Sequence, residues 1–143
     1  MAPGHVLVPL DGSPLSDEAL DHALETFDCR VTVLNVVMPL DASMSEGGIL
    51  GAGEDRVENA RERAEVLVDG ARERAAEVDR DVETAVETGD PAEAIVEFVE
   101  SSDVDHVVMG GHGGDRNELA RRFLGTVATA VVGETPVTVT VVR

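Results

Sequence analysis

Short aliphatic runs alternate with longer amphipathic stretches along this chain. Residues 5–10, 31–37 and 106–109 are brief runs rich in Val and Leu, residues 82–86 alternate more weakly, and a last run extends from Val137 to Val142. Runs of this length predict five strands, and their near-continuous apolar character is typical of strands that are buried on both faces.

Between these runs, apolar residues recur at helical spacing and turn residues mark the helix starts. Ser13 and Asp90 are predicted to be N-caps, each followed by a proline at the first helical position, and Glu93 is placed for a capping box. A glycine-rich loop is expected over residues 40–53, followed by a long helix over 55–78. The buried stripe expected on that helix comprises Val57, Ala60, Ala64, Leu67, Ala71, Ala75 and Val78.

Strands that alternate with helices predict a parallel sheet that is covered on both sides. We therefore expect one α/β domain over residues 1–143, a Rossmann-like three-layer arrangement with a five-stranded parallel sheet and helices on both faces. In such folds ligands bind beyond the carboxyl ends of the strands, where the strand order reverses. The expected site therefore lies just after Pro9, Val36 and Met109.

The charge of the chain narrows the classes of partner. It carries 29 acidic residues against 11 basic ones, for a formal net charge of −18, and every basic residue is Arg. Such a surface repels phosphate backbones and anionic lipids, so neither nucleic acids nor membranes are expected partners. We interpret it as an acidic, halophilic surface, with biased genome composition as the alternative. The absence of Lys excludes a P-loop lysine and Schiff-base catalysis.

Other classes of chemistry find little support. The single Cys29 allows no intramolecular disulfide, and the dispersed His5, His22 and His106 do not have metal-ligand spacing, so no direct protein ligand to a metal is expected. No serine has a histidine at motif spacing, so no catalytic residue is assigned. The chain opens without a signal-like segment and contains no run long enough to span a bilayer, which favours a cytoplasmic protein.

The glycine cluster 110–114 follows a predicted strand directly. Backbone N–H groups at such a place can hold phosphate oxygens, and glycine allows both unusual backbone angles and close approach of an anion. Gly125 and Thr126 then begin a helix, which adds a dipole end and a hydroxyl donor. A flexible loop would look similar in sequence, and both interpretations stay open.

Charged residues close to these glycines have two interpretations each. Arg116, Arg121 and Arg122 concentrate positive charge in an acidic chain, either to compensate a polyanion or to form salt bridges on a solvated helical turn with Glu118. Asp11 follows the first strand, where its carboxylate either accepts hydrogen bonds from a ribose or caps the next helix.

Several motifs together resemble the universal stress protein family. They are Val8-Pro9-x-Asp11-Gly12-Ser13, Leu34-x-Val36-Val37, Glu87-x-Gly89-Asp90-Pro91, Val108-Met109-Gly110-x-His112-Gly113, Gly125-Thr126 and Pro136-Val137-x-Val139. They span nearly the whole chain in the family's order.

The resemblance implies a dimer formed through the last strand, Val137 to Val142, and in some members a site for ATP with Mg²⁺. Pro9, Asp11 and Val36 would then surround the ribose and adenine, while Gly110, Gly113, Gly125 and Thr126 match the phosphate signature. That signature places nine residues between its second and third glycines, whereas 11 separate Gly113 from Gly125 here. The expected function is thus a dimeric, ATP-binding stress-response module rather than an enzyme. A slow ATP hydrolase and a nucleotide-free adaptor are the alternatives.

Overall fold

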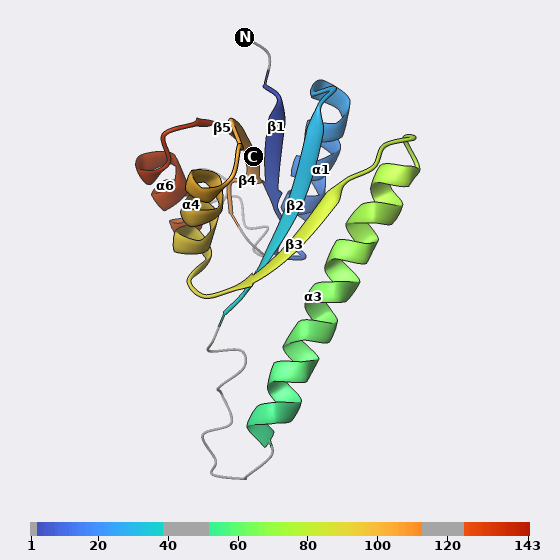
Figure 1. Ribbon diagram of the computed structural model, residues 1–143, viewed down its shortest axis with the longest axis vertical. Helices are drawn as coiled ribbons and strands as arrows, with labels where there is room; N and C mark the ends of the chain where they lie inside the picture. The colour runs from blue at the N-terminus through green and yellow to red at the C-terminus, as the bar shows by residue number, and fades with distance from the viewer. Residues whose placement is uncertain (1–2, 39–51, 113–124) are drawn as a thin grey trace.

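The computed structural model describes residues 3–38, 52–112 and 125–143, without the side chains of residues 52–57. Figure 1 shows how the elements are arranged. In chain order they are β1 (His5–Pro9), α1 (Pro14–Thr26), β2 (Arg30–Val37), α3 (Ala52–Ala76), β3 (Glu83–Thr88), α4 (Pro91–Ser101), β4 (His106–Gly110), α6 (Thr126–Glu134) and β5 (Thr138–Val142).

The five strands form one parallel sheet in the order β3-β2-β1-β4-β5. β1 is central, with Val6 level with Val31 of β2 on one side and with His106 of β4 on the other. β2 and β3 therefore follow β1 on one side of the sheet, and β4 and β5 follow on the other side. This arrangement confirms the predicted fold class.

Helices cover both faces of the sheet, α1 and α3 on one side and α4 and α6 on the other (Figure 1). Alternate residues of each strand enter two separate cores. Val6 and Val8 pack with α1 and α3, whereas Leu7 between them packs with α4 and α6. Because both faces of β1 and β4 are buried, these two strands are largely aliphatic, as their sequences predicted. The edge strands β3 and β5 contain Glu or Thr and are partly exposed.

Local capping sets the starts of two helices as predicted. The Ser13 side chain accepts a hydrogen bond from the Ser16 N–H, and Pro14 takes the first position of α1. The Asp90 side chain accepts a hydrogen bond from the Glu93 N–H at the start of α4. Each cap satisfies one of the N–H groups that a helix start leaves without an intrahelical partner.

The long helix differs from its prediction at both ends and along its buried stripe. It begins at Ala52, within the stretch expected to be a loop, and it ends at Ala76. The Asp79 backbone has φ 57°, and the Arg80 N–H bonds the Ala75 carbonyl, so the chain turns before Val78, which is 52% exposed. The expected stripe is confirmed at Ala60, Ala64, Ala71 and Ala75, which are buried, whereas Leu67 is only half-buried and its neighbour Val68 is buried instead. The side chain of Val57 lies outside the described residues.

Most of the described arginines have partners away from the sheet's carboxyl edge. Arg30 pairs with Glu83 and Asp103, Arg72 pairs with Asp69, and Arg74 binds both carboxylate oxygens of Asp21. The Arg80 guanidinium instead donates to backbone carbonyls at the end of α1. No helix in the described ranges has the length and apolar character needed to cross a membrane.

Candidate functional site

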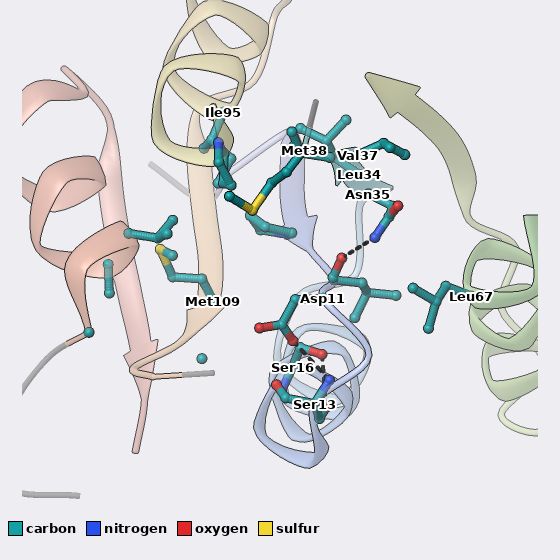
Figure 2. Close-up of a pocket in the computed structure, with 18 of the residues that line it drawn as sticks. Asp11, Ser13, Ser16, Leu34, Asn35, Val37, Met38, Leu67, Ile95 and Met109 are labelled. Carbon is teal, nitrogen blue, oxygen red and sulfur yellow. Dashed lines mark hydrogen bonds between the residues drawn. The ribbon is translucent and has the colours of Figure 1, made fainter. Parts of the chain in front are cut away.

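A pocket of about 470 Å³ opens at the carboxyl edge of the sheet, where strand order reverses between β1 and its neighbours. Its volume lies within the range of small-molecule sites, about 300–1,000 Å³. The ends of three strands line it, including the predicted Pro9, Val36 and Met109. Figure 2 shows Asp11 near the middle of the pocket, with Met109 on one side and Leu67 of α3 on the other. The pocket thus lies where the sequence predicted a site.

The turn from β1 into α1 presents Asp11 to this pocket. The carboxylate Oδ1 of Asp11 accepts a hydrogen bond of 2.8 Å from the Ser13 N–H, and Gly12 between them has φ 84°, a conformation that favours glycine. The N-cap of α1 is Ser13, so Asp11 is not the helix cap. Its Oδ2 has no hydrogen bond to any residue in the described ranges and is available to a ligand.

Asn35 holds the same turn from the neighbouring strand. Its side chain is 6% exposed, and its Nδ2 donates a 2.8 Å hydrogen bond to the Leu10 carbonyl, while the Leu10 N–H bonds the Leu34 carbonyl. Asn35 is not among the residues expected at the site from the sequence. The available signal was a lone amide in an aliphatic strand, because a buried polar side chain requires a specific partner.

Gly110 at the end of β4 and Gly111 and Gly125 after it are needed for close packing and not for unusual backbone angles. In the described ranges positive φ occurs at Gly12 and Gly89 among glycines, so the expectation of odd angles at the cluster was wrong for Gly110 and Gly111. A Cβ at Gly110 would lie 3.2 Å from the Leu15 carbonyl carbon. The Gly125 N–H bonds the Gly111 carbonyl at 2.5 Å, which brings the start of α6 against the end of β4.

The start of α6 contributes donors to the pocket. Gly125 is its N-cap, and Thr126, Val127 and Ala128 of its first turn all line the cavity. The N–H groups of a first helical turn lack intrahelical partners and carry partial positive charge, so this wall suits an anion. His112 lies in the same wall, with a buried Nδ1 that has no hydrogen-bond partner in the described ranges.

The structure thus brings together most of the predicted site residues, namely Pro9, Asp11, Val36, Gly110, Gly125 and Thr126. The remaining ones, Gly113, Arg116, Arg121 and Arg122, lie outside the described residues. No group of three or more His, Cys, Asp or Glu side chains within the described ranges is arranged to hold a metal ion.

The sequence did not predict that α3, Met38 and α4 would line part of the pocket. Leu67, expected in the core, lines the pocket with other residues of α3, and Met38 and two residues of α4 complete the lining. No local pattern indicates this wall, because it depends on where two helices pack against the sheet. The residues concerned are Met38, Ala60, Arg63, Ala64, Leu67, Pro91 and Ile95.

Fold and pocket together define a doubly wound α/β protein with a ligand site at the topological switch point. The family model of the universal stress protein family matches residues 3–143, and the chain belongs to this family.

Individual relatives agree with this assignment. Universal stress protein MJ0531 of Methanocaldococcus jannaschii is 33% identical over 96% of this chain and 81% of its own. Among solved structures, universal stress protein UspA from Lactobacillus plantarum has a TM-score of 0.80 at 23% identity, covering 100% of this chain and 99% of its own. A universal stress protein in complex with cAMP has a TM-score of 0.72 at 23% identity over 100% and 99% of the two chains.

Proposed function

We propose that this chain binds an adenine nucleotide at the carboxyl edge of its sheet and acts as a binding module rather than as an enzyme. The proposal rests on one observation: Asp11, the glycine turn formed by Gly110 and Gly111, and the start of α6 all line one pocket. A nucleotide needs an apolar surface for its base, an acceptor for its ribose and backbone donors for its phosphate, and this pocket supplies all three.

Structural neighbours support the choice of ligand. Besides the cAMP complex, an Arabidopsis thaliana family member was solved with AMP bound and an Archaeoglobus fulgidus universal stress protein in complex with dAMP. They share the fold with this chain, with TM-scores of 0.69 and 0.65. The adenine ring and a phosphate are common to all three ligands.

Within the pocket, the base lies against Pro9 and the backbone of Val36, and the ribose hydroxyls donate to Oδ2 of Asp11. The phosphate accepts from the backbone around Gly110 and Gly125 and from the Thr126 hydroxyl. ATP with Mg²⁺ is the larger ligand that we propose for the same site, with Gly113 and the three arginines of 113–124 on its outer phosphates. Product analysis after incubation with ATP separates a binding module from a slow hydrolase.

Calorimetric titration of AMP, dAMP and ATP–Mg²⁺ into nucleotide-stripped protein in molar KCl tests the proposal. Saturable binding is expected, and Asp11→Asn should weaken AMP binding about tenfold, because a charge-assisted hydrogen bond is lost while the Ser13 N–H keeps its acceptor. Asp28→Asn removes the same charge from an exposed residue that does not line the pocket, and it should leave the affinity unchanged. Folded protein that binds none of the three nucleotides contradicts the proposal and leaves the nucleotide-free adaptor.

We further propose a cytoplasmic homodimer formed through β5. This strand lies at an edge of the sheet, and the side chains of Val139, Val141 and Val142 are only half-buried. An aliphatic edge strand with unpaired backbone groups is stabilised by pairing with a second copy. Sedimentation equilibrium in molar KCl measures the mass, and a monomer at all concentrations contradicts the dimer.

A further inference from the structure

Arg63 is the one Arg among the described residues that line the pocket. The other ionisable residues of this lining are Asp11 and His112. The sequence contains no Lys that could act as a second kind of cation. Arg63 belongs to α3, whose wall lies across the pocket from Met109 and β4, as Leu67 one turn further along shows (Figure 2).

Arg63 differs from Arg61, Arg72 and Arg74 of α3 because the residues at helical spacing from it are uncharged. The residues three and four positions away are Asn59, Ala60, Val66 and Leu67. Oppositely charged side chains at these spacings are the ones that pair on a helix surface. No ion pair of Arg63 occurs within the described ranges, and its guanidinium is uncompensated on its own helix.

Arg61, Arg72 and Arg74 each have an acidic residue at helical spacing or in an ion pair. Arg61 has Glu58 and Glu65 at helical spacing, Arg72 pairs with Asp69 and Arg74 pairs with Asp21. Among these four arginines of α3, Arg63 alone has no carboxylate at helical spacing. That exception coincides with the wall of the candidate site.

The charge of Arg63 affects how strongly the pocket attracts an anionic ligand. The net charge of −18 and the Asp11 carboxylate both repel an anionic ligand from the pocket. A guanidinium at the wall that has no ion pair with another described residue offsets this repulsion, and its planar fork suits phosphate oxygens. A neutral ligand gains nothing from it.

We propose that Arg63 contacts the anionic group of the ligand and makes this pocket select a nucleotide over the corresponding nucleoside. The inference rests on the proposed adenine-nucleotide site and adds to it a residue from α3. Arg63 is thereby a specificity-determining residue for phosphate, independent of the three arginines between Gly113 and Gly125.

The test compares AMP with adenosine, which differ only in the phosphate. Arg63→Gln should weaken AMP binding about fivefold, the effect of one partly exposed charge contact, and should leave adenosine binding unchanged. Arg61→Gln is the matched control, because it removes the same charge from an exposed residue of the same helix that does not line the pocket. Equal loss in the two variants, or equal loss of AMP and adenosine in Arg63→Gln, overturns the proposal.

A second measurement separates this inference from the proposed function. Sodium pyrophosphate, which has no base or ribose, is titrated into labelled protein while the Nε–H resonances of the arginines are followed by NMR. A shift for Arg63 and none for Arg61 is expected. If AMP and adenosine both fail to bind but pyrophosphate shifts Arg63, the adenine site is wrong and the anion contact stands. If neither AMP nor pyrophosphate shifts Arg63, the anion contact is wrong.

Discussion

The two glycines of α6 allow the same substitution to be made with opposite expected results. A Cβ at Gly125 would lie 3.2 Å from the Gly111 carbonyl oxygen and 3.2 Å from the His112 Cα. At Gly133, eight residues later in the same helix, nothing lies within 4 Å of a Cβ. The backbone angles of Gly125, φ −67° and ψ 167°, are open to any residue. The expected cost at Gly125 therefore comes from contact alone.

The magnitudes follow from these distances. The atoms facing Gly125 belong to the backbone of β4's exit and cannot rotate away, so Gly125→Ala should cost about 1–3 kcal/mol, as overpacking does. Alanine is also a poorer N-cap than glycine. Gly133→Ala should gain about 0.5–1 kcal/mol, because alanine is the better residue within a helix. In a domain of this size each kcal/mol shifts the melting temperature by about 3 °C.

Thermal and urea unfolding of both variants in molar KCl measure these free energies, and AMP titration measures the effect on the site. Gly125→Ala should melt below the wild type and bind AMP more weakly, because the start of α6 must move away from the glycine turn. Gly133→Ala should melt slightly above the wild type with unchanged affinity. A Gly125→Ala protein as stable and as tightly binding as the wild type would refute the argument that close approach requires glycine here.

Three further predictions concern charge and the thiol. Hydrogen bonds from the Gly4 and His5 N–H groups lower the pKa of Asp105. The stabilisation of the fold by this carboxylate is therefore complete above about pH 4, the pKa in the unfolded chain, and is lost as the pH falls through the lower pKa of the folded protein. Asp105→Asn should be less stable than the wild type at pH 7 and should lose less stability on acidification, which acid titration of unfolding measures. Burial raises the pKa of the Cys29 thiol above its usual value, so iodoacetamide should modify it slowly at neutral pH and rapidly in urea, and equal rates in both conditions would be inconsistent with a packed thiol. Because a net charge of −18 opposes the compact state, raising KCl from millimolar to molar should raise the melting temperature, and a salt-independent midpoint would argue against a halophilic surface.

Local sequence patterns predicted the strands and the helix caps well, because these features depend mainly on residues that are neighbours in the chain. Strand runs such as the one at Val6–Val8, and the caps at Ser13 and Asp90, appear in the structure as expected. The long helix was predicted less well. Its buried stripe is confirmed at Ala60, Ala64, Ala71 and Ala75, but Leu67 is half-buried and Val68 is buried in its place. The periodic pattern predicts the buried face of a helix, whereas the surface against which the helix packs decides which residues at the margin of that face are covered.

The fold class, the end of the sheet at which the pocket opens and the family of the chain can all be predicted from the order of the amino acids. These depend on hydrophobic periodicity, on short motifs and on the rule that parallel strands end at one edge. Three features become visible in the folded chain alone: Asn35 holds the turn of Asp11, the glycines allow close packing, and α3 forms a wall with Arg63. Each of these joins residues distant in the chain, and such contacts are set by how helices and strands pack rather than by any local preference.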